Sequence, residues 1–352
     1  MRIINTVFGD AIGEYIGGRW RVVLDYARVL NGLGHQVLLV LNPRTARVEE
    51  TRLPEGIRLA WVRNSGHYDL FARWHSRRLI DEFRPDAIIA HCGRSVGVML
   101  HAARKHTPVI GVSHSNNVGR MVPADAYFNI STHIDTLIKA YPRHSKLGYH
   151  LPNMIEIPAD AEFQPRPFRQ PPKIGAMGRF DHVKGFDIYL RALGILKEKG
   201  HAFSALLGGG GKEEEELIEL RDRLGLDEQV SFVGWVGDPI AFFSDLDLVC
   251  IPSRSDAFGI TPLEAGVAGV PQVLSDAEGH RDMFVDGKHA RLIPRDRPDL
   301  LAEGLLALLE NQSYAHALAQ QAFLRVSGSY GSARFAVDLE RNLEDILHCF
   351  KK

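Results

Sequence analysis

The stretch "SRSDAFGITPLEAG" (Ser253–Gly266) carries two carboxylates, Asp256 and Glu264, on either side of a Phe-Gly step. It follows the apolar run "LDLVCIP", which predicts a buried strand. A helix is expected to begin near Pro262, because proline is tolerated in a first helical turn, where its missing N–H would have no intrahelical partner. The stretch therefore predicts a strand, a polar loop and a helix in succession.

The loop in this stretch offers a site for an anion. The backbone N–H groups of Gly259, Ile260 and Thr261 would lie at the helix N-terminus, where the helix dipole favours negative charge. Glu264, in the first turn, could accept two hydrogen bonds from a ribose diol. The alternative is a carboxylate that only stabilises an ordinary first turn.

The same alternation of strand and helix extends along all 352 residues. Strands are predicted in the first half by "RIINTVF", "HQVLLVLN", "IRLAWV", "DAIIAH", "PVIGVSH" and "AYFNIS", and in the second half by "IGAMGR", "AFSALLGG", "VSFVGW", "LDLVCIP" and "VPQVLS". Amphipathic segments of helical length separate them, which is typical of parallel sheets covered by helices. We predict an α/β protein of two doubly wound domains, with a ligand cleft at the C-terminal edges of both sheets.

The boundary between the two domains is placed at the proline-rich segment "FQPRPFRQPPK" (163–173), interpreted as a linker. The predicted domains span residues 1–165 and 166–334. The amphipathic segment at about 335–352 is expected to form a helix that crosses back to the first domain.

Composition and charge limit the classes of partner. The net charge of −1 gives no strong bias toward nucleic acid, but residues 1–165 carry 20 Lys and Arg against 15 Asp and Glu. A mildly basic first half favours an anionic partner, such as a phosphorylated acceptor or a membrane surface, although solvated surface would have the same composition.

The chain shows no signal-peptide pattern and no apolar run of about 18 residues. Cys92, Cys250 and Cys349 are far apart, which suits a reducing cytosol.

The stretch "PSRSDAFGITPLEAGVAGVPQV" resembles the Glu-x7-Glu signature of the retaining, metal-independent nucleotide-sugar glycosyltransferases of the group 1, family 4 type. "IGGRWRVVLDYARVLNGLGHQV", "MGRFDHVKGFDIYLRAL" and "SFVGWV" precede it in the expected order, so the resemblance spans nearly the whole chain. It implies a GT-B fold, in which two Rossmann-like domains face each other across a cleft. In one departure, Asp256 stands where the family usually has Glu, which shortens the reach of the acid by one methylene.

The resemblance assigns roles to individual residues. Arg179 and Lys184 would stabilise the departing diphosphate, whose negative charge grows in the transition state and requires a cation. Asp256 would meet sugar hydroxyls, and "SFVGWV" would contact the base. The catalytic candidates are Arg179, Lys184, His114 and Asp256, and the substrate-binding candidates are Gly17, Gly18, Gly234, Trp235, Val236, Phe258, Gly259, Ile260, Thr261 and Glu264.

Several of these residues have alternative interpretations. Gly17 and Gly18, just before a predicted helix, allow close backbone approach to a phosphate or acceptor, or form a plain turn. His114 ends a predicted strand, and the resemblance places it beside the transferred sugar; it could also be a hydrogen-bonded structural residue. His91, at the end of the preceding strand, is a weaker candidate of the same kind. Trp235 is either core or the wall of the base site.

Other motifs in the sequence do not indicate a nucleotide or metal site. "GGGGKEEEE" (208–216) fails as a P-loop because no Ser or Thr follows Lys212, and we interpret it as structure. His35 is expected to be structural, and the remaining histidines show no metal-ligand pattern. In "FARWHSRRLIDEFRP", basic and aromatic residues alternate, which indicates either a helix that contacts a membrane or an acceptor, or a solvated helix face; the residues are Arg73, His75, Arg77, Arg78, Phe71, Trp74 and Leu79.

We therefore expect a retaining, metal-independent glycosyltransferase of the hexosyltransferase type that needs no cofactor. It would transfer a sugar from a nucleoside diphosphate sugar to a hydroxyl of a saccharide or glycolipid acceptor, in lipopolysaccharide, polysaccharide or glycolipid biosynthesis. We expect a cytoplasmic protein with peripheral membrane contact through the first domain and no nucleic-acid partner. The alternatives are a non-catalytic nucleotide-sugar-binding GT-B protein or accessory subunit, and a GT-B sugar-nucleotide epimerase.

Overall fold

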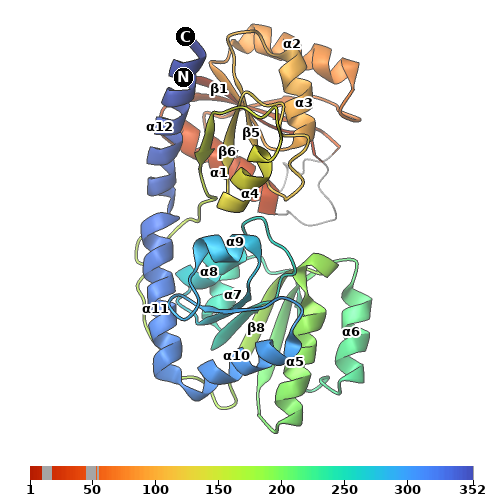
Figure 1. Cartoon of the computed structure of the whole chain (residues 1–352), viewed down its shortest axis with the longest axis vertical. Helices are drawn as coiled ribbons and strands as arrows, with labels where there is room; N and C mark the ends of the chain where they lie inside the picture. The colour runs from red at the N-terminus through yellow and green to blue at the C-terminus, as the bar shows by residue number, and fades with distance from the viewer. Residues whose placement is uncertain (10–17, 45–52, 54, 352) are drawn as a thin grey trace. The chain divides into compact units, whose positions relative to one another are not determined.

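The computed structural model describes residues 1–9, 18–44, 53 and 55–351 (Figure 1). The chain forms two compact units, one made of Met1–Met154 with Ser332–Lys352 and the other of Ile155–Gly331. Each unit is built around one sheet in which the paired strands are parallel. The fold is therefore α/β with two Rossmann-like domains, as the sequence predicts.

The first unit contains a seven-stranded sheet with the order β3-β2-β1-β4-β5-β6-β7. Its strands are β1 (Arg2–Val7), β2 (Gln36–Leu41), β3 (Arg58–Trp61), β4 (Ala87–Ala90), β5 (Val109–Val112), β6 (Ala126–Asn129) and β7 (Gly148–His150). Its helices are α1 (Gly18–Gly32), α2 (Leu70–Phe83), α3 (Gly93–Ala102), α4 (Thr132–Lys139) and α12 (Ser332–Lys351). The central strands β4, β5 and β6 are buried throughout, which explains why they are continuous apolar runs.

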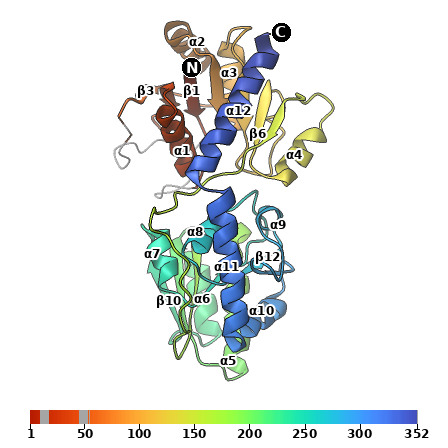
Figure 2. The ribbon, with the colours of Figure 1, turned by 90° about the vertical axis from the view of Figure 1, so that its left-hand side faces the viewer.

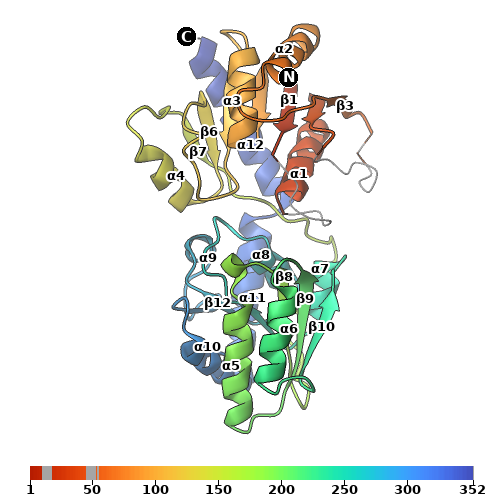
Figure 3. The ribbon, with the colours of Figure 1, turned by 90° about the vertical axis from the view of Figure 1, so that its right-hand side faces the viewer.

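The second unit contains a six-stranded sheet with the order β10-β9-β8-β11-β12-β13. Its strands are β8 (Lys173–Arg179), β9 (Ser204–Gly210), β10 (Val230–Gly234), β11 (Leu248–Ile251), β12 (Gln272–Ser275) and β13 (Arg291–Ile293). Its helices are the 3-10 turn η2 (His182–Lys184), α5 (Phe186–Glu198), α6 (Glu214–Arg223), α7 (Pro239–Ser244), α8 (Thr261–Val267), α9 (Glu278–Met283), α10 (Pro298–Glu310) and α11 (Gln312–Ser329). Figure 3 shows α5 and α6 side by side against one face of this sheet.

Both sheets have a topological switch point, because the chain leaves the first strand in one direction and returns beside it in the other. In the first unit the switch lies between β1 and β4, and in the second between β8 and β11. Open α/β sheets bind ligands at the C-terminal ends of the strands on either side of such a point. The loops after these four strands are therefore where a site is expected.

The proline-rich segment, interpreted from the sequence as a linker, packs on the second unit. Phe168 is 7% exposed and belongs to the core of the second unit. Arg169 pairs with Asp245 at 2.8 Å and with Asp247 at 3.3 Å. The division between the units falls after Met154 instead of after residue 165. Side chains between the prolines therefore pack on the second unit.

The last helix, α12, belongs to the first unit, where it runs beside α1 (Figure 2). The ring of Phe335 contacts the buried ring of Tyr26 edge to face, with centroids 4.9 Å apart. Glu340 reaches His35 at 2.6 Å, and His35 in turn lies 3.2 Å from the N-terminal amine of Met1. His35 is thus a structural residue that connects α12 to the sheet.

Candidate active site

The switch point of the second sheet brings together two of the predicted catalytic residues. Lys184 ends the turn η2 after β8, and Asp256 lies in the loop after the neighbouring strand β11. The Nζ atom of Lys184 lies 2.7 Å from Oδ2 of Asp256, and their side chains are 26% and 13% exposed. This ion pair joins the two loops that flank the switch point.

The backbones of these two loops also contact each other. Arg254 N–H donates to the carbonyl of Val183 at 2.8 Å. Gly185 has a φ of +68°, and a Cβ atom there would lie 2.3 Å from the carbonyl oxygen of Pro252. Only glycine fits this position, because any side chain would push the two loops apart. The close approach places Lys184 within reach of the short side chain of Asp256.

Asp256 is held as a carboxylate. Burial acts to raise its pKa, but the positive charge of Lys184, the nearby His280 and the amide of Phe258, which donates at 3.4 Å, lower it below its ordinary value. His280 is fully buried, and its Nδ1 donates to the carbonyl of Ser275 at 2.9 Å. The carboxylate therefore carries its negative charge directly next to the ammonium group.

The predicted anion loop follows Asp256. Helix α8 begins at Thr261, with Pro262 in its first turn, so the expected start is confirmed. Gly259 adopts a φ of +85°, which turns the chain into the helix. Within the part of the chain that the structure describes, the amides of Gly259, Ile260 and Thr261 donate no hydrogen bond to another residue. They are thus available to an anion at the edge of the sheet.

Phe258 and Glu264 fix the two ends of this loop. Phe258 is 2% exposed, and its ring lies 6.0 Å from that of Tyr330. A Cβ on Gly279 would lie 2.4 Å from Cα of Phe258, so α9 packs directly against the loop. Glu264 is only 4% exposed in the first turn of α8. The structure therefore places Glu264, Lys184 and Asp256 around one short loop of the second unit.

Arg179 lies at the same edge but makes a different contact. It ends β8, its side chain is 55% exposed, and its Nε donates to Asp181 Oδ2 at 2.5 Å. Among the described residues, the structure does not bring its guanidinium into contact with Lys184 or Asp256. The two cationic side chains that are predicted to bind the diphosphate therefore have separate carboxylate partners, Asp181 for Arg179 and Asp256 for Lys184.

The segment predicted to contact a base lies at the C-terminal end of β10. Gly234 has a φ of +69°, and the side chain of Trp235 is 49% exposed, so it is not a core residue. Val236 packs near Gly208, where a Cβ would lie 2.7 Å from its Cγ2. The glycines of β9 are structural, as expected, since a Cβ on Gly209 would lie 1.9 Å from the carbonyl oxygen of Gly178.

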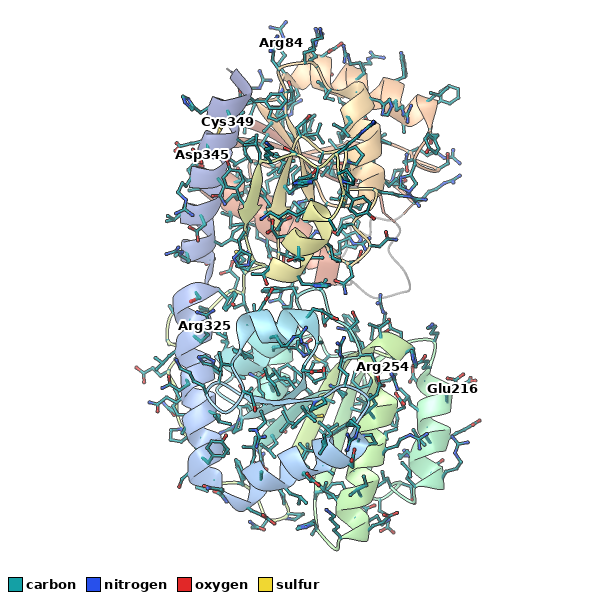
Figure 4. The ribbon with its side chains drawn as sticks, in the orientation of Figure 1. Arg84, Glu216, Arg254, Arg325, Asp345 and Cys349 are labelled. Atoms are coloured by element: carbon teal, nitrogen blue, oxygen red, sulfur yellow. The ribbon has the colours of Figure 1, made fainter. Side chains whose placement is uncertain are left out.

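Arg254 is an important residue that the sequence analysis did not single out, although it lies inside the opening stretch. Figure 4 labels Arg254 in the second unit. Its guanidinium donates to both carboxylate oxygens of Asp187 at 2.8 Å and to Asp296 at 2.6 Å. Burial acts to raise the pKa of Asp187, but the paired guanidinium lowers it. Arg254 also donates to the carbonyl of His182 at 2.9 Å. These bonds connect the loop after β11 to η2 and to α5. They thereby help to fix the position of η2, which carries Lys184.

A pair of histidines occupies the switch region of the first sheet. Nδ1 of His91 lies 3.0 Å from Nε2 of His114, and the rings are stacked with centroids 5.2 Å apart. Nε2 of His91 lies 2.7 Å from Oδ1 of Asn5, whose amide nitrogen donates to the carbonyl of Val23 at 2.8 Å. Asn5 and His91 are fully buried, and His114 is half-buried.

These contacts fix the tautomers of both rings. Because Asn5 presents its carbonyl oxygen, His91 must donate from Nε2 and accept at Nδ1. His114 then donates from Nε2, which leaves its Nδ1 without a proton. Burial and the charge of Arg19 lower the pKa of His114 from 6.5 to about 3, and burial also lowers that of His91. His114 is therefore a neutral imidazole with an acceptor nitrogen on the side opposite His91.

The remaining predicted residues contribute less. Gly18 begins α1 and is exposed, and Gly17 lies outside the described residues. No group of three or more potential metal ligands exists among the described residues. Across residues 1–9, 18–44, 53 and 55–351, no helix combines the length and the apolar character needed to cross a membrane.

Comparison with known proteins finds matches over both units. Residues 159–325 match the family described as glycosyl transferases group 1, and residues 16–145 match glycosyltransferase family 4. The lipopolysaccharide core biosynthesis glycosyltransferase LpsD of Rhizobium meliloti is 26% identical over 293 residues, or 79% of each chain. The lipopolysaccharide core biosynthesis mannosyltransferase LpcC of Rhizobium leguminosarum bv. viciae is 27% identical over 170 residues, so the match spans only 48% of that relative and 46% of this chain.

Solved structures show the same fold at lower identity. The structure of Anabaena HepE in complex with UDP has a TM-score of 0.81 and 19% identity, covering 98% of this chain and 100% of the other. The apo form of the lipopolysaccharide outer core galactosyltransferase WaaB has a TM-score of 0.79 and 18% identity, with 98% and 99% covered. The architecture is the GT-B fold that the sequence predicts.

Proposed function

The chain belongs to the glycosyl transferases group 1, and we propose on this basis that it is a retaining glycosyltransferase that uses a nucleoside diphosphate sugar. The observation that carries the proposal is the ion pair of Lys184 and Asp256 beside the open amides at the start of α8. This arrangement offers positive charge and backbone donors to a diphosphate, and a carboxylate to a sugar, within one loop region.

The diphosphate would bind to the amides after Phe258 and to the cationic side chains of Arg179 and Lys184. As the sugar leaves, these groups neutralise the charge that develops on the phosphate oxygens, so we propose that no divalent cation is required. Glu264 would hold the ribose, and Gly234, Trp235 and Val236 would contact the base. That Anabaena HepE was solved with UDP and with UDP-glucose supports this choice of ligand class.

Each unit would offer one polar group to the substrates. In the second unit, Asp256 would accept hydrogen bonds from hydroxyls of the sugar. In the first unit, the unprotonated Nδ1 of His114 would accept a hydrogen bond from a hydroxyl. The acceptor would attack from the face that the diphosphate leaves, with a phosphate oxygen taking its proton, so that no protein nucleophile is needed.

The acceptor would be a saccharide or glycolipid of the cell envelope. The names of relatives support this class, because they include lipopolysaccharide core glycosyltransferases and the phosphatidyl-myo-inositol mannosyltransferase of Mycobacterium leprae. The latter is 36% identical over 140 residues, which are 38% of this chain and 36% of that relative. We propose that the protein acts in the cytoplasm at the inner face of the membrane, which the first unit contacts peripherally.

A ligand screen followed by an activity assay tests the proposal. Thermal unfolding is measured with UDP, GDP and ADP, since a ligand at about 100 times its Kd stabilises the folded state by roughly 2.7 kcal/mol. The stabilising nucleotide should lose its effect in Lys184→Ala. The corresponding sugar donor is then incubated with the protein alone, and slow hydrolysis is the expected result.

The two alternatives give different products in this assay. A non-catalytic binding protein would be stabilised by the nucleotide but would leave the donor intact. An epimerase would convert the donor into a compound of unchanged mass, which chromatography followed by mass spectrometry detects. Stabilisation by none of the three nucleotides would contradict the proposed donor class.

A further inference from the structure

Four large apolar or aromatic side chains are exposed around the start of α2 in the first unit. The exposed fractions are 86% for Tyr68, 71% for Leu70, 84% for Phe71 and 65% for Trp74. Single exposed apolar residues are common on protein surfaces, but four within seven positions form a patch, which indicates an interaction surface. Figure 4 shows side chains of α2 that project away from the body of this unit.

The helix has two apolar faces, and only one of them packs on the protein. Ala72, Ser76, Ile80 and Phe83 are buried. At about 100° per residue, Leu70, Phe71, Trp74 and Arg78 lie together on the opposite face. The packing of α2 on α3 is therefore complete without this second face. The exposed rings are not required for the fold.

The surroundings of the exposed face are positively charged. Residues 63–83 contain four arginines and three acidic residues, Asp69, Asp81 and Glu82. Asp81 pairs with Arg77 and Arg104, and Glu82 pairs with Arg58, so the charges of both are balanced within the unit. Asp69 caps α2, since its carboxylate accepts from the amides of Ala72 at 2.9 Å and Ser65 at 2.8 Å. The guanidinium of Arg73 lies 5.9 Å from the centre of the Tyr68 ring, and Arg78 is exposed on the apolar face itself. The patch thus combines apolar rings with cationic charge.

We infer that this face of α2, formed by Tyr68, Leu70, Phe71, Trp74 and Arg78, docks the protein on an anionic lipid bilayer. Tyrosine and tryptophan rings favour the level of the lipid headgroups, and leucine and phenylalanine favour the acyl boundary just below it. Arginines between them attract anionic headgroups. A stable protein interface needs about 800 Å² on each partner, from roughly 20 residues, which this short stretch does not supply.

This face of α2 would make the peripheral membrane contact, with anionic lipids, that is part of the proposed function, and the inference rests on that function. The test is sedimentation of the full chain with vesicles of phosphatidylcholine, with and without phosphatidylglycerol. We expect binding to the anionic vesicles, and a loss of about tenfold or more in partitioning for each of Phe71→Ser and Trp74→Ser. Arg78→Ser should lose about fivefold on the same vesicles.

Two matched controls remove exposed apolar side chains elsewhere. Leu324→Ser in α11 and Val337→Ser in α12 change residues that are 56% and 62% exposed, and both should sediment like the wild type. Circular dichroism should show that all the variants are folded, because exposed substitutions of this kind have little effect on stability.

Three outcomes would overturn the inference. One is absence of vesicle binding, and another is equal binding of wild type and the α2 variants. A third is a concentration-dependent dimer in light scattering that the α2 variants abolish, since the face would then be a contact between two copies of this chain. Stabilisation by the nucleotide, measured on the same variants, reports separately on the proposed function and should be unchanged.

Discussion

The ion pair of Lys184 and Asp256 makes a prediction about stability that does not depend on any substrate. The variant Lys184→Met removes the ammonium group and keeps most of the side-chain stem. With an N to O distance of 2.7 Å and an effective dielectric constant of about 20, Coulomb's law gives roughly 6 kcal/mol of attraction. Desolvation of the two partly exposed groups cancels much of it, so we expect the variant to lose about 2 to 3 kcal/mol at pH 7.

The loss should depend on pH with a definite sign. In the wild type the pKa of Asp256 is lowered, so the pair stabilises the folded state above pH 3.8 and its contribution disappears as the pH falls through the lowered pKa. Without Lys184, the burial that acts to raise the pKa of Asp256 is opposed only by His280 and the amide of Phe258. We therefore expect this pKa to rise, so that the folded state disfavours the carboxylate. The difference between variant and wild type should therefore be largest at pH 7 and shrink toward pH 4, where the buried acid is protonated.

A second substitution provides the control. Asp256→Asn in the Lys184→Met background removes the buried charge, so we expect the double variant to recover to within about 1 kcal/mol of the wild type. Urea unfolding is followed by hydrogen exchange and mass spectrometry on peptides from Ile155–Gly331, because the two units need not unfold together. A deficit that is the same at pH 7 and pH 4, or a double variant no more stable than Lys184→Met, would refute the reasoning.

Four further predictions concern single residues. Arg179→Ala should lower turnover by about 10²-fold or more, and near wild-type turnover at saturating donor would count against its role at the diphosphate. Glu264→Gln should weaken binding of the stabilising nucleotide in calorimetry, with turnover at saturating donor less affected. Because the pKa of His114 is lowered to about 3, the first unit should lose stability as the pH falls below 6.5, and thermal melts of His114→Gln should show a smaller loss between pH 7 and pH 4.5. Gly185→Ala should destabilise the second unit by more than the roughly 1 kcal/mol expected for Gly200→Ala in thermal melts, since both have a positive φ but only the former meets a backbone oxygen.

Most of the fold could be predicted from the sequence because the central strands are buried on both faces. Runs such as "DAIIAH" and "LDLVCIP" are apolar from end to end, and they form β4 and β11. The sequence does not predict two strands, β7 and β13, which have three residues each and lie at sheet edges. The other two edge strands, β3 and β10, have four and five residues and were predicted, whereas three residues are too few to show the apolar run or alternation that indicates a strand.

The site was less predictable than the fold. The sequence motifs identified Lys184 and Asp256 separately, but nothing in either motif indicates that their side chains meet. Their contact depends on the pairing of β8 with β11 and on the close approach at Gly185, which are long-range packing effects. The link from Asn5 through His91 to His114 was missed for the same reason, since these residues come from three different strand regions.

In the proposed complex, Asp256 would serve at the position where the resemblance leads us to expect glutamate. The loops that carry Lys184 and Asp256 are joined by backbone contacts, so the shorter acid already reaches the ammonium group at 2.7 Å. An ammonium has three donors, and this bond uses one of them, which leaves two for phosphate oxygens. In the proposed complex the cation would therefore bind the diphosphate without giving up its carboxylate. Asp256 would then be fixed by Lys184 on one oxygen and could present the other to a sugar hydroxyl. The loss of one methylene would in that case shift the sugar toward the loop instead of removing the contact.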